Sequence, residues 1–415
     1  MRRLIAAARL VAVLALGLVP AGAMALPVGS GASDPSVVLG VVATLTGPGA
    51  VAGQDMVDGF NLALRQLGGR FANQEVRVVV ADDKGSPDVA AQQVRRLLER
   101  ERLDMVLTAV SPASLAAIAR PLFEARLFVL SLDQTPPAFA HEACSPWLFQ
   151  IGAPNEGVHE AMGQLLAAEK VRRLAVIGPE APSTPDAVAS LKRTFPGEIV
   201  AVLTPRHGAA TLEPEVARLK ELKPDAVYSL LTGGMGVAFV RSYGAAGLKA
   251  ESPLFVPWNA VERQLLPAMG DAAADLVSVG PWSPDLDSVP NKRLITDFET
   301  EYGRPATTWA AQAYDAAFLI DSALRATHGK TADADAVRAA LRRADFVSAR
   351  GGFRFNTNQF PILSFYARKV GRDAKGRPTH ELRGTVLKDW RDPKASTCTM
   401  RWTEEPPPPP AAKKP

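Results

Sequence analysis

The segment VVLGVVATLTGPGAVAGQDM, residues 37–56, decides the fold. Its apolar, β-branched start is typical of a buried strand, three glycines then mark a loop, and a helical pattern begins near Gln54. A strand that enters a glycine loop and then a helix is the opening unit of an α/β fold. The same layout can hold a nucleotide phosphate, so the segment leaves open what the protein binds.

Strand-like and helical runs alternate along the rest of the chain, which predicts mostly parallel sheets. The first group has expected strands at 37–45, 75–82, 104–109 and 127–131, with helices at 54–67, 87–101 and 115–124. The second has expected strands at 173–178, 198–203, 225–230, 253–257 and 276–280, with helices at 155–168, 184–194, 213–222 and 236–246. Helices at 291–302, 308–327 and 335–344 follow, and a hairpin-like pair at 352–355 and 362–370 closes the pattern. The chain therefore predicts two α/β lobes with several crossings between them, and a ligand site in the cleft between the lobes.

The first 25 residues resemble a secretory signal, with Arg2 and Arg3 before an apolar core and a small-x-small cleavage site that ends at Ala25. The apolar core is shorter than the ~20 residues that a membrane span needs, so we expect export and no stable membrane insertion. Arg2, Arg3 and Arg9 supply three of the four net positive charges of the 415-residue chain. The remainder is nearly neutral, which gives no electrostatic support to nucleic-acid binding. Residues 403–415, with a run of five prolines, are expected to be a disordered tail.

The chain has two cysteines, Cys144 and Cys398. In an exported protein an even number favours one disulfide, although two separate buried thiols are the alternative. Neither cysteine has another Cys or His nearby at metal-ligand spacing.

Known catalytic and cofactor motifs are absent from the sequence. The loop Gly47-x-Gly49-x-x-x-Gly53 is one residue too long for a dinucleotide fingerprint, and no G-K-[ST] follows a glycine loop. The five histidines form no i,i+4 pair, and Ser111 lacks the G-x-S-x-G elbow of hydrolases. We therefore expect no cofactor, no metal and no enzymatic reaction.

Hydroxyl residues recur where successive strands end, and neutral donors of this kind suit a small polar or anionic solute. The members are Thr44, Thr46, Thr108, Ser111, Ser131, Thr135, Ser183, Thr184 and Thr232. Each alone could instead cap a helix or close a turn.

Four blocks make the chain similar to the leucine/isoleucine/valine-binding family of periplasmic solute receptors for ABC transporters. They read VVLGVVATLTGPGAVAGQDMVDGFNLAL, VVVADDKGSPDVAAQQVRRLL, SPASLAAIARPLFEARLFVLSLDQTPP and FVRSYGAAGL. The resemblance implies the type I periplasmic binding protein fold, in which two Rossmann-like lobes are joined by three crossovers and close around a ligand. It places lobe 1 at 36–152 plus 284–350 and lobe 2 at 153–283 plus 351–402.

The resemblance also implies a ligand site. Ser111 and Thr135 match the residues that hold a ligand carboxylate in amino-acid-binding members, and Ser131 and Gln134 adjoin Thr135. Family aromatic contacts fall on three positions, Ala52, Thr232 and Trp309, and Ser183 or Thr184 replaces a second-lobe tyrosine. Thr44 lies at the foot of the glycine loop.

The main departure is at FVPWN, where Trp258 and Asn259 stand near the position of a glutamate that pairs with the ligand ammonium in the family's amino-acid binders. A buried ammonium without its acid would lose at least ~1–3 kcal/mol of binding free energy. We therefore expect a small carboxylate or amide-like solute. If Trp258 lines the cleft, its apolar wall would suit an aromatic or hydrophobic solute; the alternative is that Trp258 packs in the core. The expected role is that of a monomeric, periplasmic binding protein that delivers its solute to an ABC permease. The alternative is a sensing module that reports to a signalling partner.

Overall fold

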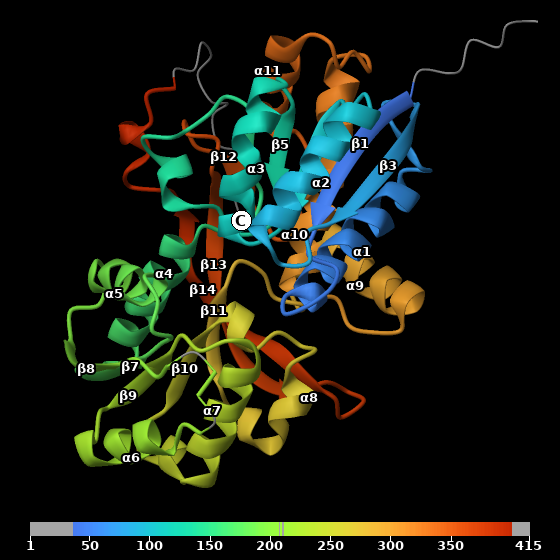
Figure 1. Cartoon of the computed structure of the whole chain (residues 1–415). Coiled ribbons are helices and arrows are strands. Elements are labelled where there is room, and N and C mark those ends of the chain that lie inside the picture. The colour runs from blue at the N-terminus through green and yellow to red at the C-terminus, as the bar shows by residue number, and fades with distance from the viewer. Residues whose placement is uncertain (1–35, 207, 210, 401–415) are drawn as a thin grey trace, which may run out of the picture. The chain divides into compact units, whose positions relative to one another are not determined.

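The computed structural model describes residues 36–206, 208–209 and 211–400 of the chain (Figure 1). The predicted signal ending at Ala25 and the predicted tail at 403–415 lie outside the described residues. Within the described ranges, no helix combines the length and the apolar character needed to cross a bilayer.

The first sheet is built by the N-terminal part of the chain. Its strands are β1 (Ser36–Ala43), β2 (Arg70–Phe71), β3 (Gln74–Asp82), β4 (Met105–Ala109), β5 (Phe128–Ser131) and β6 (Leu148–Gln150). They lie in the order β2-β3-β1-β4-β5-β6, and β1 pairs in parallel with both β3 and β4. The chain order reverses at β1, which makes this a doubly wound sheet.

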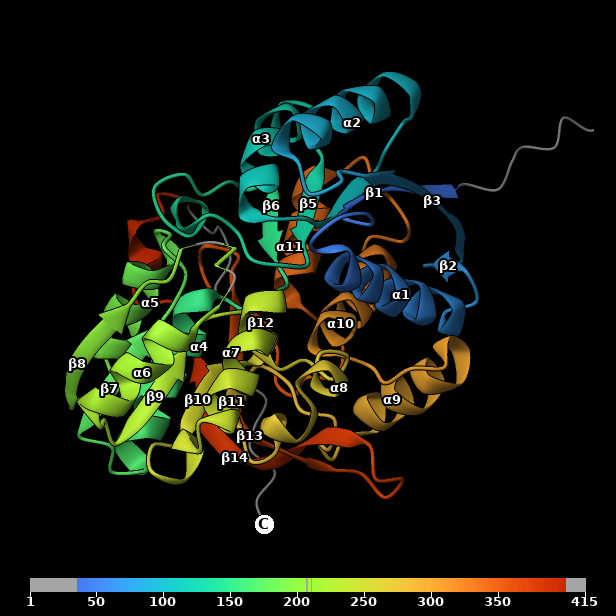
Figure 2. The same cartoon turned by 60° about the horizontal axis from the view of Figure 1, so that its bottom comes forward.

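Helices cover both faces of this sheet (Figure 2). On one face α2 (Pro87–Arg100) and α3 (Pro112–Glu124) pack on Val42, Val106 and Val129. On the other face α1 (Ala50–Gln66) and α10 (Thr308–Ala326) pack on Val41, Leu107 and Leu130. Successive strand residues therefore enter opposite cores, which explains the unbroken apolar runs of the sequence.

The second sheet repeats this plan. Its strands are β7 (Arg173–Ile177), β8 (Glu198–Leu203), β9 (Ala226–Ser229), β10 (Leu254–Pro257), β11 (Val277–Gly280), β12 (Arg354–Phe355), β13 (Pro361–Arg372) and β14 (Pro378–Trp390). Its first five strands lie in the order β8-β7-β9-β10-β11, the same winding as in the first sheet, and β13 adds antiparallel to β11. Helices α4 (Asn155–Ala168) and α5 (Ser183–Lys192) cover one face, and α6 (Glu213–Leu222) and α7 (Gly233–Ala245) cover the other. The predicted α/β class, with two mostly parallel sheets, is confirmed.

The chain passes between the two sheets three times, as the family resemblance implies. The first passage follows β6, the second follows β11 and leads through α9 (Val289–Tyr302) to α10, and the third follows α11 (Ala334–Arg343) and leads to β12. The lobe boundaries given above stay a prediction.

A buried ion pair ties the first and third passages together. On α10, Asp315 accepts hydrogen bonds from Arg350 Nε at 2.7 Å, from Ser348 Oγ at 2.6 Å and from the Ala349 amide at 2.9 Å. Arg350 also donates to the carbonyl of Ile151, just after β6, at 3.1 Å. Both charged side chains are essentially inaccessible to solvent, at 0% and 1% exposure.

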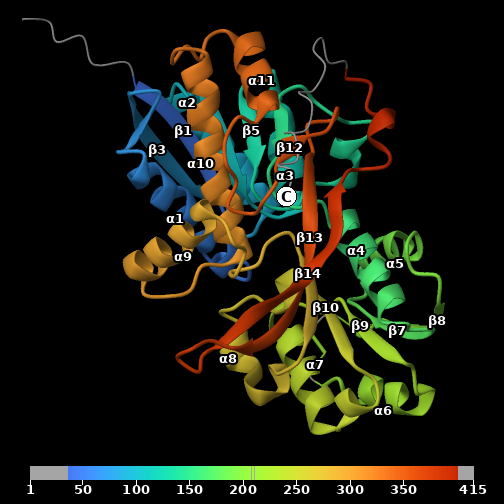
Figure 3. The ribbon, with the colours of Figure 1, turned by 180° about the vertical axis from the view of Figure 1, so that it is seen from behind.

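Strand β14 is the largest element that the sequence analysis missed. It pairs with β13 along a long hairpin that is seen from behind in Figure 3. Its sequence, PTHELRGTVLKDW, places polar or charged residues at most positions because it lies beside β13 only, with much of its length partly exposed. Without a run of apolar residues, periodicity gives no strand signal here.

Two glycines of α1, Gly53 and Gly59, allow this helix to pack closely against its neighbours. A Cβ at Gly53 would lie 1.9 Å from the carbonyl oxygen of Thr44, so only glycine lets the first turn of α1 approach the end of β1 this closely. Six residues later, a Cβ at Gly59 would lie 2.2 Å from the carbonyl oxygen of Ala310 on α10. These two glycines fix how α1 sits between the strand end and α10.

Cys144 and Cys398 form a disulfide, with Cα atoms 5.7 Å apart. Beside it, His141 Nε2 lies 3.2 Å from a carboxylate oxygen of Asp392. Asn358 also donates to the carbonyl of Ala140 at 2.8 Å. The segment after β5 is therefore fastened to the C-terminal part of the second sheet.

Candidate ligand-binding site

Two adjoining cavities lie at the carboxyl ends of strands from both sheets. The first, of about 220 Å³, is lined by Pro112, Gln134, Thr135, Pro137, Ala140, Gln150, Ala153, Pro154, Asn155, Glu156, His159, Ser183, Asp186, Ser190 and Phe360. The second, of about 190 Å³, is lined by Gln134, Asn155, His159, Pro179, Ser183, Ala187, Leu230, Thr232, Pro257 and Asn259. Four residues line both cavities, namely Gln134, Asn155, His159 and Ser183, so the two form one candidate site. Open α/β sheets bind ligands at this end of their strands.

The loop after β5 brings two predicted contacts to the site. Thr135 lines the first cavity, and no hydrogen bond of its hydroxyl is found among the described residues. Gln134 lines both cavities and donates from Nε2 to Asn155 Oδ1 at 3.2 Å. Ser131 is buried below them and donates to the carbonyl of Asp133 at 3.2 Å, so it shapes the loop from inside.

Helix α5 forms a second wall. Ser183, Asp186 and Ser190 line the first cavity from one side of this helix, because positions three or four residues apart share a face. Thr184 points the other way. It is buried and donates to the carbonyl of Pro179 at 2.7 Å.

Residues after β9 and β10 close the second cavity. Thr232 precedes α7 at its N-cap, where its side chain makes no capping hydrogen bond, and it lines the cavity with Asn259. Trp258 is only 2% exposed and packs edge-to-face on Trp309, with ring centroids 5.3 Å apart. Both rings belong to the apolar core or pack against it.

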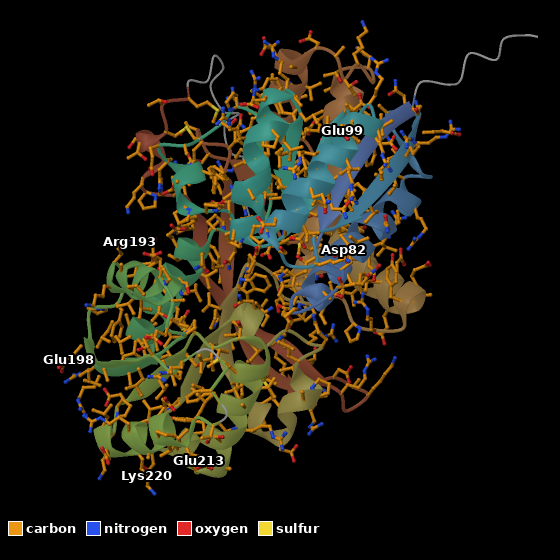
Figure 4. The ribbon with its side chains drawn as sticks, in the orientation of Figure 1. Asp82, Glu99, Arg193, Glu198, Glu213 and Lys220 are labelled. Atoms are coloured by element: carbon orange, nitrogen blue, oxygen red, sulfur yellow. A yellow bond between two sulfur atoms is a disulfide. The ribbon has the colours of Figure 1, made fainter. Side chains whose placement is uncertain are left out.

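Three predicted contacts from the segments after β1 and β4 lie outside the residues that line these cavities. Ser111 caps α3 by accepting from the Ser114 amide at 3.2 Å, and its neighbour Pro112 lines the first cavity. Thr44 donates to Asp83 Oδ1 at 2.7 Å, and Ala52 packs against the core. Asp82, labelled in Figure 4, accepts from the Leu45 amide at 2.9 Å and thereby orders the loop after β1.

Helix α4 contributes the residues that sequence reasoning missed. Asn155 and His159 lie one turn apart on the same face and line both cavities. His159 Nδ1 lies 2.8 Å from the hydroxyl oxygen of Tyr228 on β9. Burial, with a smaller contribution from the Arg193 charge, lowers the pKa of His159 from 6.5 to about 3, so the ring is neutral. The sequence holds no signal for this residue beyond its place four residues after Asn155.

The charge of the lining is unusual for an anion site. Glu156 and Asp186 both line the first cavity, and none of the described residues that line either cavity is Lys or Arg. Both acids stand in the first turn of a helix, where the helix dipole favours a negative charge. The site can therefore offer neutral donors and backbone amides to a ligand oxygen, and carboxylates to a ligand cation.

The buried His159 predicts a pH-dependent stability. Its folded pKa is below its unfolded value, so the unfolded chain binds more protons and stability is lost as the pH falls through about 6.5. Between pH 7 and pH 5 this single group should cost about 2 kcal/mol of unfolding free energy. Between pH 7 and pH 5, we expect the free energy of unfolding to fall by about 2 kcal/mol more in the wild type than in His159→Gln. Urea unfolding at both pH values measures the difference. Equal losses in the two proteins would contradict the assignment.

Comparisons with known proteins agree with this architecture. Residues 36–376 match the family model described as "Periplasmic binding protein". A Leu/Ile/Val-binding protein homolog 6 from Brucella melitensis is 22% identical over 350 residues, covering 82% of this chain and 89% of the relative.

Solved structures show the same fold. An ABC transporter substrate-binding protein from Sphaerobacter thermophilus superposes with a TM-score of 0.80 at 25% identity, covering 86% of this chain and 98% of that one. A solute-binding protein of an ABC transporter from R. palustris, in complex with benzoate, has a TM-score of 0.78 at 23% identity, covering 87% and 99%. Because the family model spans most of the sequence, including every described strand except β14, the chain belongs to the periplasmic binding protein family.

Proposed function

We propose that this protein is the solute-binding component of an ABC transporter and carries a small carboxylate, preferably aromatic or otherwise hydrophobic. The observation that carries the proposal is the site at the carboxyl ends of both sheets, which combines neutral hydrogen-bond donors with apolar walls. The predicted contacts among these donors are Gln134, Thr135, Ser183 and Thr232.

Neutral donors can hold a carboxylate without a cationic side chain. Hydroxyl and amide groups donate directly, and the positive ends of the α4 and α5 helix dipoles also favour an anion. The apolar part of the solute would contact Pro112, Ala140 and Phe360 in the first cavity and Leu230 in the second. The benzoate complex of the R. palustris relative supports an aromatic acid as the first candidate.

A free amino acid is the second candidate, because Glu156 and Asp186 line the first cavity. Either carboxylate could pair with a ligand ammonium. It would then take the role of the family glutamate, near whose position this chain has Trp258 and Asn259. The Brucella relative, named a Leu/Ile/Val-binding protein homolog, supports this class. The two candidates differ in one group, the ammonium, so a direct comparison of ligands separates them.

The proposed mechanism is a population shift. A solute held by residues from both sheets favours the conformation in which all of those contacts form, and this liganded form is delivered to the permease. The protein would act as a monomer in the periplasm after cleavage of the signal at Ala25, and the partner ATPase would supply the energy. The proposed lobes are 36–152 with 284–350 and 153–283 with 351–402.

The first test is a calorimetric and thermal-shift comparison of benzoate, 4-hydroxybenzoate, leucine and isoleucine. We expect the aromatic acids to bind and to raise the melting temperature, and leucine and isoleucine to bind at least tenfold more weakly. Tighter binding of leucine or isoleucine would reject the aromatic acid and select the amino-acid candidate. Recovery of unchanged ligand after denaturation would fit binding without catalysis, whereas turnover would contradict it.

Thr135 supplies the matching side-chain test. Thr135→Val keeps the shape of the residue but removes its hydroxyl, and we expect it to weaken benzoate binding by about 1–1.5 kcal/mol, roughly five- to tenfold. Thr300→Val on the exposed surface of α9 is the matched control, since Thr300 bonds only to the carbonyl of Thr296. An unchanged affinity in Thr135→Val would remove Thr135 from the contact residues.

Whether the liganded protein serves transport or sensing depends on its partner. We expect uptake of labelled benzoate into cells to require this protein together with an ABC permease. If uptake is independent of the protein while a signalling response to benzoate requires it, the sensing alternative holds.

A further inference from the structure

We infer that His159 is a ligand-binding residue, held by Tyr228 as a neutral imidazole that donates a hydrogen bond from Nε2–H to an oxygen of the solute. The inference rests on the proposed function for the identity of the solute, but the state of the ring can be tested without any ligand.

The contact between the two rings is enclosed. His159 is 4% exposed and Tyr228 is fully buried, and the rings meet edge-to-face with centroids 5.9 Å apart. The only hydrogen bond of the Tyr228 hydroxyl within the described residues is the 2.8 Å contact to His159 Nδ1. The proton of this hydroxyl therefore has one available acceptor.

The hydrogen bond between Tyr228 and His159 determines which ring nitrogen of His159 carries the proton. If Nδ1 carried the proton and donated it to Tyr228, the tyrosine O–H would be left buried without an acceptor, which native structures avoid. If Tyr228 donates to Nδ1, its proton is satisfied and the imidazole proton resides on Nε2. The fully buried Tyr228 therefore fixes His159 as the Nε2–H form.

The Nε2–H group faces the site without a protein partner. No acceptor for Nε2 is found among the described residues. Several polar atoms of these residues are unpaired and shielded from solvent, but Nε2 is not among them, so it remains accessible. Since His159 lines both cavities, the accessible part of its ring opens into them. A donor in this position requires a water molecule or a ligand oxygen.

Burial keeps the donor neutral, and one neighbouring charge makes a smaller contribution. Arg193, labelled in Figure 4, pairs with Glu160 at 2.6 Å, and its positive charge disfavours a second cation at His159. Glu156, on α4 itself, and Asp186, on α5, also line the first cavity. A neutral donor can serve a carboxylate or a carbonyl oxygen alike over the pH range in which a free histidine would change its charge.

Asn155 adds a second donor one turn before His159. Its Oδ1 accepts from Gln134 Nε2 at 3.2 Å, which assigns the side-chain oxygen to the protein and turns the amide nitrogen away from this contact. Two donors one turn apart on α4 match the two oxygens of a carboxylate, which is the strongest acceptor among small solutes.

The test combines a spectroscopic measurement with binding. In the ligand-free protein, the ¹⁵N shifts of the His159 ring, assigned by comparison with His159→Gln, should show a protonated Nε2 and an unprotonated Nδ1 between pH 6 and pH 8. Tyr228→Phe should give a mixture of tautomers. A protonated Nδ1 in the wild type would overturn the inference even if no solute is known.

Benzoate is the binding probe. We expect His159→Phe to weaken its binding at least tenfold and Tyr228→Phe to weaken it three- to tenfold, with the double variant no weaker than His159→Phe alone. Tyr243→Phe, which removes a buried hydroxyl that donates to the carbonyl of Ser252 at 2.8 Å, is the matched control and should bind as the wild type does. If His159→Phe does not fold, Tyr228→Phe carries the test.

The outcomes separate the two proposals. If the wild type binds benzoate and both His159→Phe and Tyr228→Phe bind it equally well, the inference fails while the proposed function stands. If the wild type binds isoleucine but not benzoate, the aromatic ligand is rejected, and the same variants are then titrated with isoleucine, whose carboxylate serves as the probe. If neither binds, the proposed ligand classes fail and the ring spectrum alone decides the state of His159.

Discussion

Replacing Asp315 with alanine is expected to lower the free energy of unfolding by about 3–5 kcal/mol. The change removes the acceptor of the Arg350, Ser348 and Ala349 hydrogen bonds at once. The larger part of the loss comes from Arg350, because its guanidinium would remain fully buried without a counter-charge. Urea unfolding followed by tryptophan fluorescence measures the change.

Asp335→Ala is the matched control for this variant. Asp335 pairs with Arg338 at 2.7 Å, but its carboxylate is 91% exposed and therefore stays hydrated in the folded protein. We expect its removal to change the free energy of unfolding by no more than about 1 kcal/mol. A loss of the same size in both variants would show that the buried pair contributes no more than a surface contact.

Removing the disulfide is expected to cost about 2–4 kcal/mol of stability. The bridge joins residues 254 positions apart, so its loss enlarges the conformational freedom of a long stretch of unfolded chain. The double variant Cys144→Ser, Cys398→Ser should melt at a lower temperature than the oxidised wild type. Its melting temperature should also be unaffected by a reducing agent, whereas that of the wild type should fall.

The bridge should also affect ligand binding, because Cys144 follows the segment that carries Pro137 and Ala140 to the first cavity. We expect benzoate affinity to decline modestly in the double variant, by less than the loss in Thr135→Val. Identical melting temperatures with and without reductant in the wild type would show that the bridge does not stabilise the fold.

The strands that could be predicted from the sequence are those whose residue pattern is typical of a single kind of structure. The unbroken apolar runs at β1, β4 and β5 can be satisfied only in strands that are covered on both faces. The edge strand β14 could not be found in this way, because its polar residues meet solvent and its pairing depends on β13. The three-residue β6 is too short for a periodic signal.

Site residues were harder to predict than the fold because a hydroxyl at a strand end has several possible partners. Thr44, Ser111 and Thr184 each occupy the predicted loop or helix start, yet their hydroxyls bond to Asp83, Ser114 and Pro179. Only three-dimensional contacts separate them from Thr135, which has a similar sequence context and lines the cavity. Trp258 shows the same ambiguity, since a large apolar side chain after a strand can form a ligand wall or fill the core.

His159 lies beyond sequence reasoning for a further reason. Its partner Tyr228 is 69 residues away on β9, and within its strand that tyrosine looks like any other core residue. The pairing arises only because α4 packs across the second sheet. Long-range hydrogen bonds of this type leave no local pattern in a single sequence.

The residues that line the site come from the ends of several different strands, and this arrangement has a consequence for evolution. Apart from Phe360, which lies between β12 and β13, the lining residues come from the ends of β4, β5, β6, β7, β9 and β10 and the segments that follow them, so each wall is attached to its own strand end. A substitution at a lining residue whose side chain bonds to no other wall, such as Thr135 or Thr232, leaves the other walls and the apolar cores in place. Descendants of one ancestral receptor could therefore acquire new solutes through a few independent changes, without first passing through an unstable intermediate.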